Sequence, residues 1–95
     1  MAKAVVNGTV LAESTETVVV EGNHYFPPAS VQWDHFAETA HTSVCGWKGT
    51  ASYYSVTVGD DTLDNVAWTY REPMDAAAEI KDYVAFYPQI SVEVE

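Results

Sequence analysis

The sequence is short of positive charge. It holds four Lys and Arg residues against 14 Asp and Glu, a formal net charge of −10 over 95 residues. Proteins that bind nucleic acid neutralise its phosphates with clustered cations, and anionic membrane surfaces attract basic segments in the same way. We therefore expect no nucleic acid and no membrane among the partners of this chain, and look for a small-molecule ligand instead.

The sequence also lacks a second cysteine and a long apolar run. Because Cys45 is the single cysteine, no intrachain disulfide forms, which suits a reducing compartment. No apolar stretch approaches the roughly 20 residues that span a bilayer, and no secretory leader pattern opens the sequence. These absences predict a cytoplasmic protein. The length of 95 residues predicts one domain, residues 1–95, which we expect to be a monomer or a weak homodimer.

Leucine and isoleucine are scarce. The sequence has two of each, whereas it has 14 Val, 9 Thr and 12 aromatic residues. Branched and aromatic side chains suit a pleated, half-buried surface, so the composition predicts a mainly β fold of predominantly antiparallel strands. We expect the strands at residues 2–6, 9–13, 16–21, 39–45, 50–58, 63–70, 83–87 and 90–94, with one or two short helices at residues 29–36 and 75–81.

Local patterns add detail to several of these segments. Asn7 and Gly8 separate the first two strands, and both residues tolerate the positive φ of a type I′ turn. Strand alternation is expected to place Val66, Trp68 and Tyr70 on one face of their strand.

In the strand before it, alternation places Tyr54, Val56 and Val58 on one face. In the last strand, it points Ile90, Val92 and Val94 inward. We also expect Met74 and Ile80, at either end of the second helix, to pack inward.

A metal site is poorly supported by the sequence. His24, His35 and His41 would have to join Cys45, but none of them has the close spacing that zinc sites use. The acidic residues around Asp60 do not match a calcium loop. We expect neither a metal nor a cofactor.

Two aromatic segments, residues 45–54 and 66–70, hold five of the twelve aromatic residues, together with Lys48, and Arg71 follows the second. One interpretation is a pocket for an anion or a carbonyl group, with aromatic walls, a lysine as point charge and exposed backbone N–H groups at Gly46 and Gly49. The other is a turn with Lys48 in solvent and the aromatic rings filling the core.

Cys45 also has two interpretations. Lys48 follows three residues later, and a nearby cation would favour the thiolate, as a nucleophile requires. His41 is the nearest base in the sequence, but on a straight strand it would lie about 13 Å from Cys45 at about 3.3 Å per residue. A buried, unreactive thiol is the simpler alternative.

Three strings in order resemble a known family. They are Cys-Gly-Trp-Lys-Gly-Thr-Ala-Ser-Tyr-Tyr at residues 45–54, Val-Ala-Trp-Thr-Tyr followed by a proline at residues 66–73, and Tyr-Val-Ala-Phe-Tyr at residues 83–87. They look like the signature of the domain of unknown function 427 family of small bacterial and archaeal proteins, and the resemblance covers most of the chain. Gly46 stands where many members have proline, and Trp47 where they have tyrosine.

The resemblance implies a compact, twisted antiparallel structure similar to the β-tent domains. Many β-tent proteins carry zinc on four cysteines, which a chain with one cysteine cannot supply. The family has also carried a nucleotidyltransferase label, but no recognisable carboxylate pair supports that activity here. By analogy with ligand-binding β-tent proteins, the resemblance implies an aromatic binding face. The candidate ligand-binding residues are Cys45, Trp47, Lys48, Tyr54, Trp68 and Tyr70.

Three functions follow as hypotheses. The first is a binding domain for a small anionic or carbonyl-containing ligand, with Lys48 as its anchor. The second is an enzyme with Cys45 as thiolate nucleophile beside Lys48. The third is a structural or partner-binding module that associates through an exposed strand edge.

Overall fold

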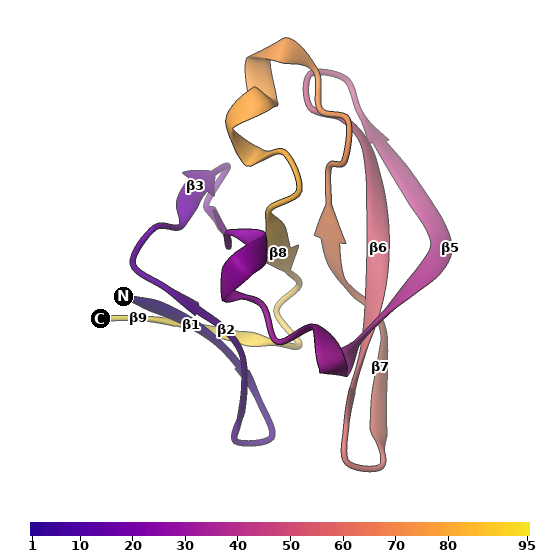
Figure 1. Ribbon diagram of the computed structural model, residues 1–95. Helices are drawn as coiled ribbons and strands as arrows, with labels where there is room; N and C mark the ends of the chain where they lie inside the picture. Colours follow the sequence, from indigo (N-terminus) through magenta and orange to yellow (C-terminus); the bar gives the residue numbers. More distant parts are fainter.

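A computed structural model describes all 95 residues and shows a mainly β fold of three antiparallel sheets (Figure 1). One sheet has the order β2-β1-β9, with β1 at Ala2–Val6, β2 at Thr9–Ser14 and β9 at Ser91–Val94. A two-stranded sheet pairs β3 (Val18–Val20) with β4 (Asn23–Tyr25). The largest sheet has the order β5-β6-β7-β8, with β5 at Phe36–Cys45, β6 at Gly49–Val58, β7 at Asp61–Thr69 and β8 at Val84–Phe86. The predicted fold class and most of the predicted strands are confirmed.

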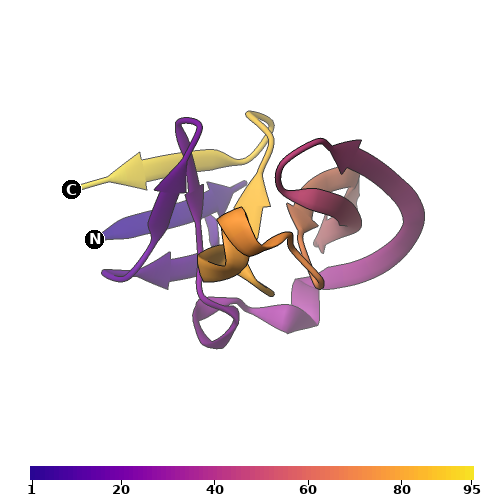
Figure 2. The ribbon, with the colours of Figure 1, turned by 90° about the horizontal axis from the view of Figure 1, so that it is seen from above.

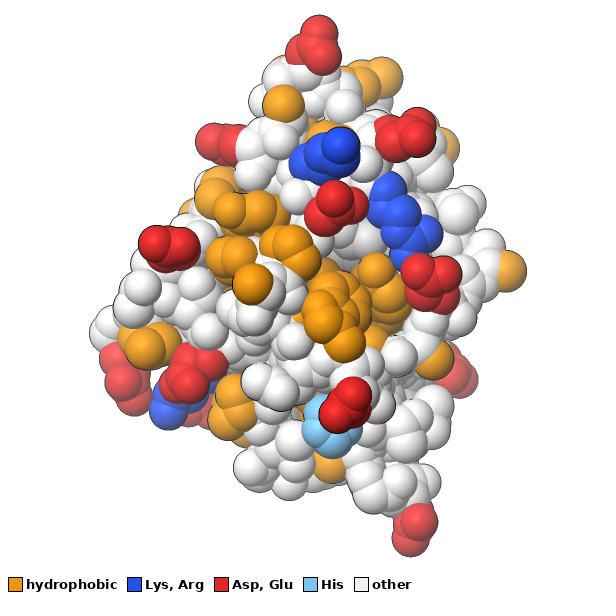
Figure 3. All heavy atoms as spheres, viewed as in Figure 1, with side chains coloured by type: hydrophobic (Ala, Val, Ile, Leu, Met, Phe, Trp, Pro, Cys, Tyr) orange, Lys and Arg blue, Asp and Glu red, His pale blue; other side chains and the backbone are white.

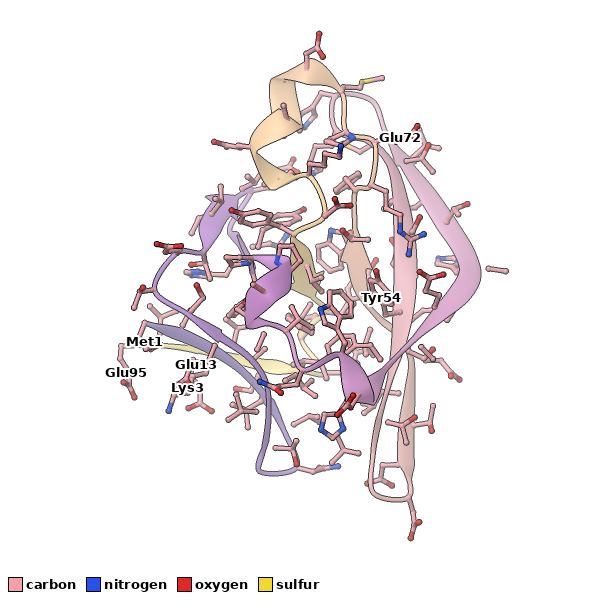
Figure 4. All side chains as sticks on the ribbon, viewed as in Figure 1. Met1, Lys3, Glu13, Tyr54, Glu72 and Glu95 are labelled. Carbon is pink, nitrogen blue, oxygen red and sulfur yellow. The ribbon has the colours of Figure 1, made fainter.

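The first hairpin follows from its turn residues. Asn7 and Gly8 have φ values of 48° and 74°, as a type I′ turn requires, so the turn prediction is confirmed. On the other side of β1, β9 brings the two ends of the chain together: Met1 and Glu95 are joined by backbone hydrogen bonds. Figure 4 shows these ends beside Lys3 and Glu13, which pair across the β1–β2 hairpin at 3.5 Å.

The buried residues form two clusters. The first lies between the N-terminal sheet and the large sheet and contains Ala2, Ala4, Leu11, Ala12, Phe26, Val31, Tyr54, Val56, Val66, Ala67, Val84, Phe86 and Ile90. The second contains Tyr25, Ala51, Tyr53, Trp68, Tyr70, Ala77, Ile80 and Ala85. Seen from above, the N-terminal sheet and the strands β5, β6 and β7 of the large sheet stand on opposite sides of the molecule, with β8 and the η3 turn (Asp75–Ile80) between them (Figure 2). The strands β6, β7 and β8 of the large sheet therefore have buried side chains on both faces.

A bulge in β7 changes the predicted face of Val66. The β6–β7 register shifts between Tyr54 and Val56, and Asn65 takes a left-handed φ of 53°. As a result Val66 lies in the first cluster, whereas Trp68 lies in the second. The prediction that Val66 shares a face with Trp68 and Tyr70 is wrong, because a bulge inserts residues that strand alternation does not count. Tyr54, Val56 and Val58 do share one face, as predicted.

The strand β5 forms one edge of the large sheet and is irregular. Its register against β6 is broken between Glu38 and Thr42, so residues 39–41 leave the ladder. The Thr39 hydroxyl donates a hydrogen bond to Asn65 Oδ1 at 2.6 Å. This bond connects the irregular part of β5 to the bulge in β7.

The two predicted helices are short 3-10 turns. The first prediction, residues 29–36, contains η1 (Pro28–Ser30) and η2 (Trp33–His35). Between them the chain extends, because Val31 pairs with Ala12 of β2 and the Gln32 N–H donates to the Leu11 carbonyl at 2.7 Å. None of the helical turns has the length and hydropathy that crossing a membrane would need.

The second predicted helix, residues 75–81, is η3, which is interrupted where Ala77 has φ −119° and ψ 19°. Ile80 is buried as predicted, but Met74 is exposed. Met74 donates its N–H to the Lys48 carbonyl, which fixes its backbone there. In the last strand Ile90 is buried and Val92 is partly buried, whereas Val94 is exposed near the end of the sheet.

Candidate functional site

The turn between β5 and β6 places a lysine inside the molecule. Lys48 is only 7% exposed, and its ammonium lies 5.1 Å from the centroid of the Trp47 ring and 5.8 Å from that of Tyr70. Its charge partner is Glu21, from the turn between β3 and β4. Lys48 is therefore not a solvated turn residue, and that part of the alternative interpretation is wrong. Its other part is confirmed, because Tyr53, Tyr54, Trp68 and Tyr70 are buried in the core clusters.

The main chain fixes the position of Lys48. Its carbonyl accepts a hydrogen bond of 2.9 Å from the Met74 N–H. Gly49 follows with φ 113°, and a Cβ at this position would lie 3.3 Å from the Glu72 carbonyl oxygen. Glycine is required here because the backbone is left-handed and a neighbouring main chain passes close by. Figure 4 shows Glu72 near the tip of the β5–β6 hairpin.

Tyr70, which contacts the lysine, belongs to the second cluster together with further aromatic residues. The Trp68 indole N–H donates to the Tyr25 hydroxyl at 3.1 Å, and the two rings meet edge to face with centroids 6.2 Å apart. Burial raises the pKa of Tyr70 to about 12, and the nearby Tyr25 and Cys45 contribute. Burial also raises the pKa of Tyr25, against the opposing effect of the Trp68 hydrogen bond. These phenols stay neutral at physiological pH.

A second group of hydroxyls adjoins Trp68. The Tyr53 hydroxyl lies 2.8 Å from Ser43 Oγ and 3.2 Å from the Tyr87 hydroxyl. Tyr87 is tilted over Trp68 with centroids 4.7 Å apart, and its pKa is raised to about 12 by the hydrogen bond with Tyr53 and by burial. The aromatic surroundings of the lysine therefore extend from Tyr70 to the partly exposed Tyr87.

Tyr54 lies apart from the other candidate ligand-binding residues. It belongs to the first cluster, on the opposite face of β6 from Tyr53. Trp33 and Phe36 pack around its ring, at centroid distances of 5.4 and 5.9 Å. Figure 4 shows Tyr54 near the middle of the molecule, on the face where Figure 3 displays a central apolar patch with most acidic side chains toward the margin.

Arg71 is held beside Tyr54 and not beside Lys48. Its Nη2 donates to Glu38 at 2.7 Å and to the Tyr54 hydroxyl at 3.3 Å. The hydrogen bond with Tyr54 is the main cause that raises the pKa of Arg71, and Glu38 adds to it. The two cations that the sequence places near the aromatic segments thus occupy different sites.

Cys45 is partly buried and packs against the second cluster, near the rings of Tyr25 and Tyr70. His41 packs edge-on against Tyr53, with ring centroids 4.5 Å apart. No group of three or more His, Cys, Asp or Glu side chains gathers in a way that could hold a metal ion.

Of the six candidate residues, the structure therefore places the Lys48 ammonium over the rings of Trp47 and Tyr70. Trp68 lies in the same cluster as Tyr70, and Cys45 packs against that cluster. Two residues of this site were absent from the sequence prediction. Glu21 lies 27 residues from its partner, and no local pattern links the two. Tyr25 had a weak signal, since it precedes Phe26 and two prolines in an extended path.

The surface has two hollows, and Lys48 lines neither of them. One, of about 390 Å³, is lined by Gly49, Thr50, Ser52, Arg71, Glu72 and Met74. The other, of about 440 Å³, is lined by Gly22, Asn23 and His24 on one side and by residues of the β8–β9 segment on the other. The Glu21 turn thus stands between the second hollow and Lys48.

Comparison with protein families adds one finding. The model of the family described as "Domain of unknown function (DUF427)" matches residues 1–95. No curated protein matches the chain.

Proposed function

The chain belongs to the family of unknown function DUF427, and we propose that it is a binding domain that holds a small anionic or carbonyl-containing ligand at the Lys48 ammonium. The observation that carries this proposal is the placement of Lys48. In a chain with a net charge of −10, one of four cations is withdrawn from water and set between two aromatic rings.

Burial makes this ammonium a strong receptor for negative charge. A charge taken out of water needs a compensating partner, and its attraction to an anion grows as the surrounding dielectric falls. The rings of Trp47 and Tyr70 stabilise the cation through their faces. Trp47 is 41% exposed, so its ring also offers a surface on which a planar part of the ligand would stack.

The rest of the molecule limits the ligand to a small one of low charge. The net charge of −10 repels anions at long range, and salt screens that repulsion over about 10 Å at 0.1 M ionic strength. A multiply charged anion would be repelled more strongly than a monoanion, and a single ammonium would have to offset that repulsion. A monoanion, or a neutral molecule with a carbonyl group, fits this balance.

The geometry favours binding over nucleophilic chemistry at Cys45. The groups near the thiol are Tyr25 and Tyr70, whose raised pKa values keep them neutral. His41, the nearest base in the sequence, packs against Tyr53 instead. A general base must lie within hydrogen-bond reach of the proton that it takes, and these contacts provide none for Cys45.

A thermal-shift screen tests the proposal. The panel contains small carboxylates, inorganic phosphate and neutral amides, applied to the wild-type chain, to Lys48→Met and to Lys81→Met, which removes an exposed cation as a control. A ligand at 100 times its Kd stabilises the folded chain by about 2.7 kcal/mol. We expect the shift in the wild type and in Lys81→Met but not in Lys48→Met. Equal shifts in all three, or none in the wild type, would contradict the proposal.

A further inference from the structure

We propose that the Glu21 carboxylate occupies the position of the ligand's own carboxylate, so that the ligand is a small monocarboxylate and the β3–β4 turn is the lid that opens to admit it. The inference rests on the proposed function and adds two statements to it: the chemical class of the ligand, and an internal competitor for the site.

The first observation is the unequal burial of the two partners. The Lys48 side chain is 9% exposed and the Glu21 side chain 51% exposed. The carboxylate is thus the outer member of the pair and returns to water at little cost, whereas the ammonium stays where the main chain fixes it. An incoming carboxylate can replace the outer partner without any rearrangement of the inner one.

The second observation is the backbone at Glu21. Glu21 and Gly22 have φ values of 53° and 79° and form the two-residue turn between β3 and β4. A type I′ turn favours Asn, Asp or Gly at its first position, and the other such turn in this chain has Asn7 there. Glutamate is strained at this position, so its presence points to a role for its side chain.

The third observation is how lightly the turn is held. The strands β3 and β4 have three residues each and form a sheet of their own. A two-stranded hairpin is marginally stable on its own in water. Its firm attachment lies beyond the turn, where Phe26 and Val84 exchange backbone hydrogen bonds. Val18, Val20 and Tyr25 pack the two strands against the second cluster, whereas on its other side the turn borders the hollow of about 440 Å³, so its outward movement meets no packed layer on that side.

The test measures binding of sodium benzoate, a planar monocarboxylate, by calorimetry. Benzamide serves as the neutral probe of the same shape and inorganic phosphate as the anion of another class. Three variants are compared with the wild type: Glu21→Gln, Glu21→Asn and Glu16→Gln. Glu21→Asn removes the charge and places a favoured residue in the turn, which guards against a loss of folding. Glu16→Gln makes the same charge change at an exposed residue nearby.

We expect both Glu21 variants to lower the Kd for benzoate about tenfold, the factor that corresponds to an ion pair of about 1.4 kcal/mol, and Glu16→Gln to leave it within about twofold. If the wild type binds benzoate and the Glu21 variants bind it no more tightly, the inference that Glu21 competes for the site is overturned, whereas the proposed function stands. Phosphate or benzamide bound as tightly as benzoate would overturn the ligand class. If no probe binds either the wild type or the Glu21 variants, the inference and the proposed function are both overturned.

Discussion

The ion pair between Lys48 and Glu21 predicts an unequal response to the loss of either partner. Lys48→Met removes the ammonium and keeps an unbranched chain of similar length between Trp47 and Tyr70. The carboxylate left behind is 51% exposed and hydrates. Breaking a buried ion pair is costly where it leaves an uncompensated charge buried, and here the charge that remains is in contact with water. We therefore expect the free energy of unfolding to change by less than about 1 kcal/mol.

Glu21→Gln has the larger cost, although Glu21 is the more exposed residue. It leaves an ammonium with a 9% exposed side chain without a carboxylate, and only the amide oxygen of the new Gln remains as an acceptor. An unsatisfied buried group costs about 1–3 kcal/mol. We expect a loss of about 1–2 kcal/mol, which lowers Tm by about 4–8 °C per kcal/mol for a domain of this size.

Urea unfolding followed by tryptophan fluorescence measures both values, and the double variant completes the cycle. The double variant is expected to be as stable as Lys48→Met alone, because the ammonium that needs a partner is gone. A Lys48→Met variant less stable than Glu21→Gln would refute the reasoning, since it would show that the ammonium stabilises the fold more than its burial costs.

Three further predictions concern the surroundings of the site. Gly49→Ala should lower the free energy of unfolding by about 1–3 kcal/mol, because φ is 113° and the new Cβ would lie 3.3 Å from a main-chain oxygen. Gly46→Ala, with no atom within 4 Å of its Cβ, should stay within about 0.5 kcal/mol in the same urea assay, and an equal loss in both would count against the close approach. Trp68→Phe removes the hydrogen bond of 3.1 Å to Tyr25 and should cost about 1–3 kcal/mol in urea unfolding, whereas an unchanged midpoint would mean that the bond contributes nothing. The pKa of Tyr70 is raised from 10.0 to about 12, so the folded chain keeps this proton longer than the unfolded chain, and the stability that it contributes below pH 10 should be lost as the pH rises toward 12. Tyr87 also has a pKa raised to about 12, so alkaline absorbance titration should show one late-ionising phenol fewer in Tyr70→Phe than in the wild type, and identical titrations of the two proteins would contradict the assignment.

Local signals predicted most of the strands. The turn at Asn7 and Gly8 needs only two residues that tolerate positive φ, and the strand β1 occupies the predicted residues 2–6. Alternation likewise grouped Tyr54, Val56 and Val58 correctly. Such features depend on neighbours along the chain, and composition and periodicity report on those neighbours directly.

Features that depend on distant residues were not predictable in the same way. The bulge at Asn65 separates Val66 from Trp68, and it is stabilised through contacts with Ser55 and Thr39 on two other strands. The helix expected after Pro28 is divided because the segment pairs with β2. These tertiary contacts override local preference.

The candidate site was likewise predicted only where local signals sufficed. The sequence singled out Lys48 and its aromatic neighbours from their clustering in an acidic chain. It gave no means to decide whether Lys48 is solvated, because the answer depends on Glu21, which is 27 residues away. Tyr54 shared a motif with the others but points to the opposite face of the sheet from Tyr53.

The irregularity in β5 has a consequence for how copies of this chain meet in solution. An exposed edge strand of ten residues is a template on which another chain could add a strand and begin to aggregate. The break at residues 39–41 divides this edge into two short straight pieces, and such bulges twist an edge away from regular pairing. A substitution that straightened this segment would remove that protection and make it easier for a second copy to add a strand at this edge.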